Sequence, residues 1–292
     1  MRGKTYRTVH QSCWTADERV KDMDRLSIGL QCLSPMPELL SYWLPAEDAQ
    51  RLVRYLNDQI ASMAARFPGR FCGFGAVPLQ DVELAVRELE YIMNDLHFRG
   101  VELASHVNGV SIADSRFEAF FTAAEKLGAA IFVHALRPIG QDRVVGPISE
   151  QAACFPGDIG LCAASFITSG MAERHPGLRI AFSHGGGVLS VLIARLNRAW
   201  RLQQKLREAL PQEPLTYAQR FYYDAIVFEP ATLRFMMQIY GSSQIVLGSD
   251  YPFALGEPDP VSFLERCGLD VESQRAIFRG NAARYLDLAL DH

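Results

Sequence analysis

Short apolar runs alternate with longer amphipathic stretches along the whole of this chain. Seven of the runs have the length and the content of β-branched and aromatic residues that buried strands require. They span residues 27–34, 71–79, 98–105, 129–136, 178–186, 220–228 and 243–251. After the first run, Leu52, Leu56, Ile60 and Met63 recur at the spacing of one helix face. The pattern therefore predicts alternating strands and helices.

Strands that are apolar on both faces and alternate with helices form parallel sheets covered by helices. Two α/β folds meet this description, the doubly wound open sheet and the (β/α)8 TIM barrel. The nucleotide-binding forms of the open sheet are not favoured, because no strand is followed by GxGxxG or GxxxxGK(S/T). No linker, low-complexity tract or charge block divides the sequence, so we expect a single domain over residues 1–292.

Ionisable side chains end three of the predicted strands. His134 ends "AAIFVH", His184 ends "LRIAFSH" and Asp250 ends "IVLGSD". One such residue is usually a hydrogen-bonded core residue, but three at equivalent places are hard to ascribe to packing. A (β/α)8 barrel gathers the carboxyl ends of its strands around one active site, so the sequence favours the barrel. Two imidazoles and a carboxylate suit a divalent metal ion such as Zn2+.

The composition excludes several kinds of partner. Hydrophobic residues make up 49% of the 292 positions, which is enough for a large folded core. The 29 basic and 33 acidic residues give a net charge of −4 without long runs, so neither nucleic acid nor an anionic membrane surface is expected. No apolar segment has the length of a membrane span or a signal peptide, and six scattered cysteines without a CxxC pair indicate reduced thiols. We expect a cytoplasmic protein with a small-molecule ligand.

Several motifs together resemble the amidohydrolase superfamily. They are "AIFVH" (130–134), "IAFSHGGG" (180–187), "LIARLNRAW" (192–200), "IVLGSDYPFALGE" (245–257) and "IFRGNAARYLDL" (277–288). Within that superfamily they are most similar to the branch of aminocarboxymuconate-semialdehyde decarboxylase and other metal-dependent, non-oxidative decarboxylases. The resemblance extends over nearly the whole chain and implies a carbon–carbon lyase acting on a small unsaturated or aromatic carboxylic acid.

The resemblance also implies roles for the three strand-end residues. His134 would be a metal ligand, Asp250 a ligand or a proton-handling carboxylate, and His184 an acid/base group beside the metal-bound water. Loss of CO2 leaves a carbanion, so an enzyme of this class must protonate the carbon or hold the developing charge near a metal ion. The expected cofactor is a divalent metal, with Zn2+ as the first candidate.

Two arginines match positions at which this branch binds the substrate carboxylate. They are Arg7 in "GKTYRTV" and Arg195 in "LIARLNRAW", and the planar guanidinium fork suits a carboxylate. The resemblance further implies a homodimer in which the arginine of the second motif reaches the site of a neighbouring subunit. A solvated helix face for Arg195 and a surface position for Arg7 remain open.

Other polar residues have simpler interpretations. His97 and His175 lie in helix-ending stretches and are expected at the surface or as caps. His106, just past a strand, is more simply a solvated loop residue than a substrate contact, and Asp224 in "YYDAIVF" is a weak candidate for supporting the site.

The sequence departs from the family pattern at its start. In such barrels the first strand carries His-x-His, which supplies two metal ligands from one side of the strand. The early histidine of this chain, His10, is followed by Gln11 and Ser12. Only seven strands are predicted where a barrel has eight, and the first is the one that is missing. The expected metal site is incomplete without it.

Three explanations of this departure are open. The sequence is a truncated form of a protein that begins roughly 30 to 50 residues earlier, the length that a first barrel strand and its loop require. Alternatively, it is a short form with weakened metal binding and an exposed sheet edge, or His10 acts as a substitute ligand.

Two other function classes compete with decarboxylation. A hydrolase or hydratase acting on a lactone, an amide or an enol acid would use the same metal site to add water. A catalytically impaired barrel that serves only in protein interactions is the other alternative. The exact substrate cannot be read from the sequence.

Overall fold

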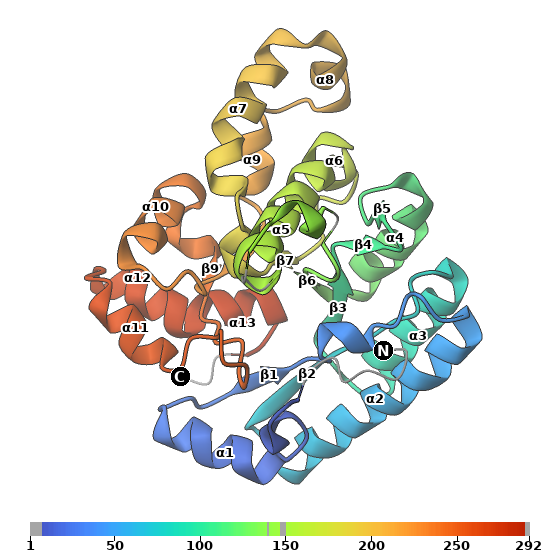
Figure 1. Ribbon diagram of the computed structural model, residues 1–292, viewed down its shortest axis with the longest axis vertical. Helices are drawn as coiled ribbons and strands as arrows, with labels where there is room; N and C mark the ends of the chain where they lie inside the picture. Colours follow the sequence, from blue (N-terminus) through green and yellow to red (C-terminus); the bar gives the residue numbers. More distant parts are fainter. Residues whose placement is uncertain (1–7, 139, 147–149, 290–292) are drawn as a thin grey trace.

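Seven parallel strands form one sheet. The computed structural model of the protein describes residues 8–138, 140–146 and 150–289. The strand order is β1-β2-β3-β6-β7-β8-β9 (Figure 1). The strands are β1 Gln31–Leu33, β2 Phe71–Gly75, β3 Gly100–Ala104, β6 Ala130–His134, β7 Ile180–Phe182, β8 Tyr222–Asp224 and β9 Ile245–Val246. Each lies inside one of the seven runs that the sequence predicts as strands, so that prediction is confirmed.

The sheet curls into a partial barrel whose end strands are β1 and β9. Neighbouring strands pair in parallel, from Gln31 beside Phe71 at one end to Asp224 beside Val246 at the other. Within the described ranges, β1 and β9 each pair on one side only. A complete (β/α)8 barrel has eight strands. This sheet has seven of them in the parallel order of a barrel. The predicted barrel class, with seven recognisable strands, is confirmed.

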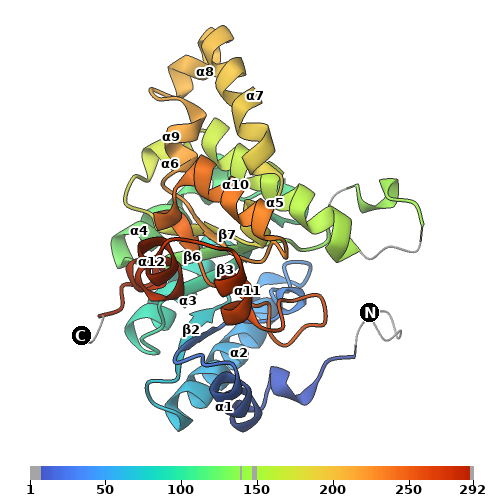
Figure 2. The same cartoon turned by 90° about the vertical axis from the view of Figure 1, so that its left-hand side faces the viewer.

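Helices pack around the curled sheet, as Figure 1 and Figure 2 show. They are α1 Ala16–Arg25, α2 Ala46–Arg66, α3 Val82–Asn94, α4 Glu118–Leu127, α5 Glu150–Thr168, α6 Met171–Arg174, α7 Leu189–Leu202, α8 Gln204–Ala209, α9 Pro214–Ala218, α10 Pro230–Tyr240, α11 Pro260–Arg266, α12 Val271–Arg275 and α13 Asn281–Leu286. In the described ranges, none of them is both long and apolar enough to cross a membrane. The sequence did not predict the small antiparallel hairpin of β4 (His106–Val107) and β5 (Val110–Ser111) that follows β3.

Aromatic side chains pack against one another inside the barrel. Phe74 of β2 and Phe132 of β6 stack with ring centroids 6.2 Å apart. Tyr285 of α13 packs edge-on against Phe74 at 6.0 Å, and its hydroxyl donates to the Ile131 carbonyl at 2.8 Å. These three aromatic side chains also line a cavity of 1020 Å³ that extends to the carboxyl ends of the strands, where barrels place their active sites.

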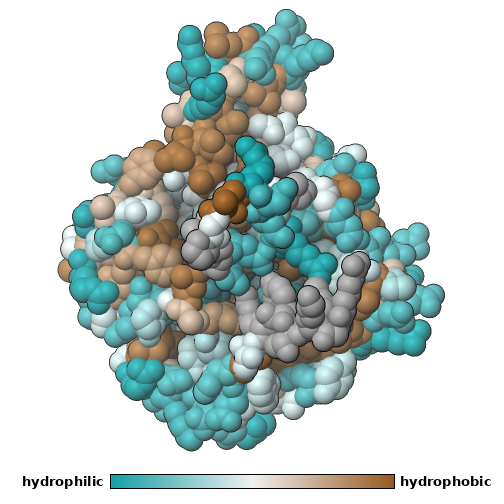
Figure 3. Space-filling view, in the orientation of Figure 1, coloured by the Kyte–Doolittle hydropathy of each residue, from teal (hydrophilic) through white to brown (hydrophobic). Residues whose placement is uncertain are grey.

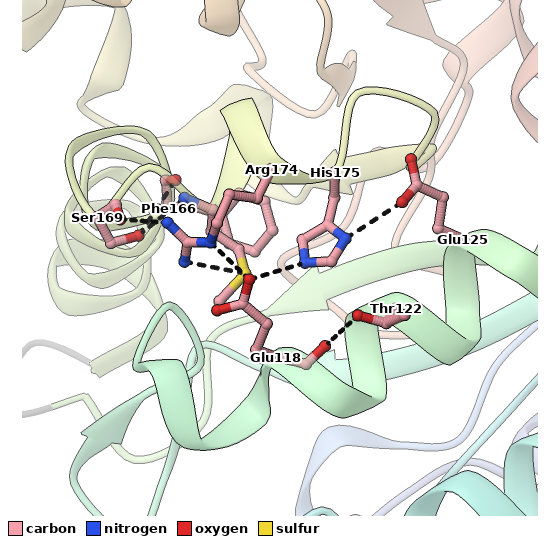
Figure 4. Close-up of polar contacts among 8 residues, drawn as sticks. Glu118, Thr122, Glu125, Phe166, Ser169, Arg174 and His175 are labelled. Atoms are coloured by element: carbon pink, nitrogen blue, oxygen red, sulfur yellow. Dashed lines mark hydrogen bonds and ion pairs between the residues drawn. The ribbon is translucent and has the colours of Figure 1, made fainter. Parts of the chain in front are cut away.

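His175 is the C-cap residue of α6, as one of the two expectations had it, but it is buried and not at the surface. Its side chain is 5% exposed and lies between two carboxylates of α4 (Figure 4). Its Nδ1 is 3.2 Å from Glu125 and its Nε2 is 3.7 Å from Glu118, while Arg174 donates to Glu118 at 2.5 Å. The sequence shows that a helix ends here, but it does not show that α4 covers that end.

Replacing His175 with asparagine is expected to lower the free energy of unfolding by about 1 to 3 kcal/mol, the usual cost of removing a buried hydrogen-bonding partner. The same replacement at exposed His97 is the matched control and is expected to change the free energy little. Urea unfolding of the two variants checks this. Equal unfolding midpoints for the two variants would show that the contacts of His175 do not stabilise the fold.

Candidate active site

The structure brings His134, His184 and Asp250 together at the open end of the barrel. His134 is the last residue of β6, and its ring centroid is 4.8 Å from that of His184. All three residues line both of two cavities, one of 1020 Å³ and one of 800 Å³. Convergence of three strand-end residues is what the barrel hypothesis requires. The chemical roles of the three residues stay predictions.

His184 and Asp250 lie beyond their strands rather than on them, which corrects the strand ends read from the sequence. The strand β7 ends at Phe182, and β9 ends at Val246. Both catalytic candidates have positive φ angles, 54° for His184 and 57° for Asp250. A backbone in this region cannot continue a strand, so the chain turns and directs each side chain over the barrel.

The three glycines after His184 are required by close backbone packing. All three have positive φ angles, between 56° and 73°. A Cβ atom at Gly187 would lie 1.8 Å from the carbonyl oxygen of Pro156 in α5. Only glycine permits that approach, so the motif "SHGGG" fixes the turn that presents His184 by packing it against α5.

Asp224 holds this turn in place. The carboxylate lies at the end of β8 and is 3% exposed. It accepts hydrogen bonds from the backbone N–H groups of His184 at 2.8 Å, Gly185 at 2.9 Å and Ile226 at 3.0 Å. Burial raises the pKa of Asp224 to about 7, and the three N–H donors oppose that rise. Asp224 therefore positions His184 through the main chain.

Asp224→Asn is expected to lower kcat by about 10- to 100-fold, because the amide cannot accept from all three donors and His184 loses its support. The KM is expected to change little, because Asp224 reaches the site through another residue. Steady-state kinetics check this split. The control is Asp270→Asn, which removes the N-cap carboxylate that Ser273 contacts at 2.8 Å, remote from the cavities. A loss of stability with unchanged kcat would contradict the positioning role.

The two imidazoles differ in their surroundings: a hydrogen bond fixes the tautomer of His134, and burial lowers the pKa of His184. Nδ1 of His134 is 2.8 Å from the carbonyl oxygen of Ala135. A carbonyl only accepts, so Nδ1 carries the hydrogen and the lone pair lies on Nε2, the tautomer that suits metal ligation. Burial, and then the nearby His134, hold the pKa of His184 well below its usual 6.5. His184 is therefore neutral near pH 7, which leaves a lone pair on one ring nitrogen.

Glu102 is a buried carboxyl group inside the barrel that the sequence reading missed. It lies on β3, lines the 1020 Å³ cavity and is 1% exposed. One of its carboxyl oxygens has no hydrogen-bond partner, and Ser34 contacts the group. Burial, with a smaller contribution from the charge of Asp250, raises the pKa of Glu102 to about 8. The signal in the sequence was a charged residue at an inward position of the apolar strand "GVELA".

Glu102 makes stability depend on pH. Its pKa is 4.5 in an exposed chain and about 8 in the fold, so the native protein favours the neutral form. Its contribution is fully present below pH 4.5 and is lost as the pH rises through 8. The glutamine of Glu102→Gln stays neutral at every pH, so at about pH 9 this variant is expected to have a higher free energy of unfolding than the wild type. The difference is roughly 5 kcal/mol at most, since one pKa unit corresponds to about 1.36 kcal/mol.

Urea unfolding of metal-free protein between about pH 5 and about pH 9 measures this dependence. The matched control is Glu90→Gln on the exposed face of α3, which should follow the wild-type pH profile. Parallel profiles for the wild type and Glu102→Gln would show that Glu102 is ionised at little cost in the fold.

The described residues fit part of a divalent-metal site. His134 offers an imidazole and Asp250 a carboxylate, both common ligands of Zn2+. Among the residues that the structure describes, no group of three or more histidine, cysteine, aspartate or glutamate side chains lies close enough to hold a metal ion. His10 does not join them, because it lines neither cavity and its Nδ1 is 2.7 Å from the hydroxyl of Ser12.

The two arginines predicted to bind the substrate carboxylate stay predictions. Arg195 is exposed on α7 and lines neither cavity. Arg7 lies outside the described residues. A different arginine, Arg137 in the segment after β6, lines the 800 Å³ cavity beside the two histidines. The sequence analysis did not single out Arg137.

Taken together, the curled parallel sheet and the cluster of His134, His184 and Asp250 at its open end define a barrel enzyme of the metal-dependent class. Residues 8–288 match the sequence profile of the amidohydrolase family, so the chain belongs to the amidohydrolases. The resemblance to the aminocarboxymuconate-semialdehyde decarboxylase branch, inferred from the motifs, is confirmed.

Similar proteins include several decarboxylases. The chain is 33% identical to the 2-amino-3-carboxymuconate-6-semialdehyde decarboxylase of Dictyostelium discoideum, over 98% of this chain and 80% of the relative. The 5-carboxyvanillate decarboxylase LigW from Sphingomonas paucimobilis is 26% identical, with a TM-score of 0.84 over 93% of this chain and 83% of that one. A dihydroxybenzoic acid decarboxylase from Polaromonas sp. JS666 shares the fold, at 24% identity and a TM-score of 0.83, over 93% of this chain and 85% of that one.

Proposed function

We propose that this protein is a metal-dependent, non-oxidative decarboxylase, a carbon–carbon lyase that acts on a small unsaturated or aromatic carboxylic acid. The observation that carries the proposal is the convergence of His134, His184 and Asp250 on one cavity in a chain of this family. The names of the similar proteins support the substrate class, since each is a decarboxylase of an unsaturated or aromatic acid.

His134 and Asp250 would hold a divalent metal ion, with Zn2+ as the first candidate. The tautomer of His134, fixed by the Ala135 carbonyl, supports its assignment as a ligand. A bound divalent ion would supply Lewis-acid stabilisation of negative charge on the substrate.

His184 and Asp250 handle the proton in this proposal. When the bond to CO2 breaks, its electron pair stays on the substrate carbon, which must receive a proton. An imidazole and a carboxylate that line the same cavity can take a proton from water and pass it to that carbon. The backbone hydrogen bonds to Asp224 keep the turn of His184 fixed while this happens.

A screen for CO2 release tests the proposal. The purified protein is incubated with a panel of hydroxylated aromatic and unsaturated carboxylic acids, in the presence of Zn2+ or Mn2+ or after treatment with a chelator. We expect metal-dependent CO2 release from at least one acid. Loss of substrate with the carboxyl group retained would instead indicate a hydrolase or a hydratase.

A homodimer and a cytoplasmic location complete the proposal. Val191 and Leu202 of α7 are 63% and 64% exposed, and Arg195 lies on the same helix. Figure 3 shows hydrophobic residues gathered over this projecting part of the molecule. Burial of these side chains in a dimer would bring Arg195 to the partner's surface, and light scattering measures the oligomeric state.

The six cysteines, all in the described ranges, form no disulfides, which fits a reducing compartment.

A further inference from the structure

Arg137 is an exposed residue on the wall of the smaller cavity. Of the described residues that line the 800 Å³ cavity, Arg137 is the only arginine or lysine. It shares that cavity with His134, His184 and Asp250. A carboxylate that enters a mostly apolar cavity loses its hydration and needs a cationic partner there. Two further carboxylates, Glu38 and Glu150, line the same cavity. Among the described wall residues, Arg137 therefore supplies the permanent positive charge that a ligand's carboxylate needs.

The guanidinium of Arg137 is positioned by an aromatic ring. Its Cζ atom lies 3.7 Å from the centroid of the Trp43 ring, a contact that orients the group by cation–π attraction and stacking. Stacking uses the face of the guanidinium, whereas its N–H donors point outward in its plane. That in-plane fork has the shape that a carboxylate binds with two parallel hydrogen bonds.

The backbone at Arg137 is also held. Its carbonyl oxygen is 3.1 Å from Nε2 of His106, and Nδ1 of His106 accepts from the backbone N–H of Gly109 at 3.1 Å. An accepting Nδ1 leaves the hydrogen on Nε2, so His106 donates to Arg137. The residue has a φ angle of 49°, which is unusual for an arginine. The position of the side chain is therefore set by the β4–β5 hairpin as well as by Trp43.

The rest of this cavity suits a flat unsaturated ligand. Its described walls are largely apolar, with the aromatic and aliphatic side chains of Leu136, Phe155, Ile226, Val227, Phe228, Met236, Phe253 and Leu255. The two histidines and Asp250 lie on the same cavity. A conjugated acid can thus pack its carbon skeleton against these walls and extend a carboxylate toward the rim.

We propose that Arg137, oriented by Trp43, forms a carboxylate-binding subsite for an aromatic or unsaturated acid at the mouth of this cavity. This inference rests on the proposed function and adds a residue to it, an arginine from the chain's own segment after β6. Arg137 determines which acids bind. It takes no part in the proton transfer.

Direct binding of a simple pair of ligands tests the subsite. Benzoate and its neutral counterpart benzamide are titrated into the full chain, and binding is followed by calorimetry and by the fluorescence of the tryptophans. We expect tighter binding of benzoate. Arg137→Gln should weaken benzoate binding by about 10- to 100-fold, the loss of a charge-assisted pair of hydrogen bonds, and leave benzamide binding unchanged.

Two further variants make the test specific. Arg143→Gln removes an exposed arginine of the same segment that lines neither cavity, and it should bind benzoate as the wild type does. Trp43→Leu should weaken benzoate binding while Arg137 is retained, because the guanidinium loses its orienting ring. Equal affinity of the wild type for benzoate and benzamide, or benzoate binding that is unchanged in Arg137→Gln, overturns the proposal.

The subsite and the proposed function can fail separately. If benzoate binding depends on Arg137 but no acid loses CO2, the subsite stands and decarboxylation is wrong. If the protein decarboxylates an acid and Arg137→Gln has the same KM, decarboxylation stands and the subsite is wrong. When both hold, Arg137→Gln should raise KM by about 10- to 100-fold with kcat changed much less.

Discussion

His134→Asn and Asp250→Asn are each expected to lower kcat/KM by at least about a thousandfold and to remove divalent-metal binding. The two side chains are the proposed ligands on the cavity wall. A metal ion contributes several kcal/mol of stabilisation to developing charge, and each 1.36 kcal/mol corresponds to about a tenfold change in rate. Calorimetric titration with Zn2+ measures binding independently of turnover.

Matched controls separate this effect from a loss of folding. His97→Asn changes an exposed histidine, and Asp270→Asn changes a helix cap far from the cavities. Both should bind the metal and turn over substrate as the wild type does. If either His134→Asn or Asp250→Asn kept the full rate, the assignment of the site would be wrong.

His184→Asn is expected to lower kcat by about 100- to 10,000-fold, the usual contribution of a general acid or base. Metal binding should remain, because His184 is assigned to the proton and not to the metal. The asparagine fits the same turn, since this residue type adopts positive φ angles more readily than most. Steady-state kinetics beside calorimetric titration with Zn2+ distinguish the two roles. Loss of metal binding together with the rate would make His184 a ligand.

The barrel could be predicted because its strands carry a strong local signal. Each strand is buried on both faces, so it appears in the sequence as an apolar run between turn residues. The clustering of His134, His184 and Asp250 followed from the fold class, since a barrel places the ends of its strands around one mouth. The barrel and the cluster of these three residues could therefore both be predicted from the sequence.

The turns after the strands could not be predicted in the same way. His184 and Asp250 follow their strands directly in the sequence, yet both lie beyond the last paired residue and adopt positive φ angles. Their conformation depends on contacts with distant segments, such as the approach of Gly187 to Pro156. Tertiary contacts of this kind have no local pattern.

Glu102 was missed, and the burial of His175 was not predicted, for a related reason. Glu102 and His175 are ordinary charged or polar residues in the sequence, and their burial depends on which elements pack over them. Arg137 becomes a candidate only when Trp43, far away along the chain, is seen to lie under its guanidinium. The resemblance to relatives pointed to Arg195 at the site of a neighbouring subunit, and the structure places Arg195 on an exposed helix face.

The fate of the carboxyl group in labelled water tests the central claim most directly. An acid identified in the screen, labelled in its carboxyl carbon, is incubated with the metal-loaded protein in deuterated water and, separately, in water carrying labelled oxygen. We predict that the label leaves as CO2 and that the substrate carbon takes up one deuterium, with no labelled oxygen added to the remaining product. A product that retains the carboxyl label and gains labelled oxygen would contradict decarboxylation and identify the protein as a hydrolase or a hydratase.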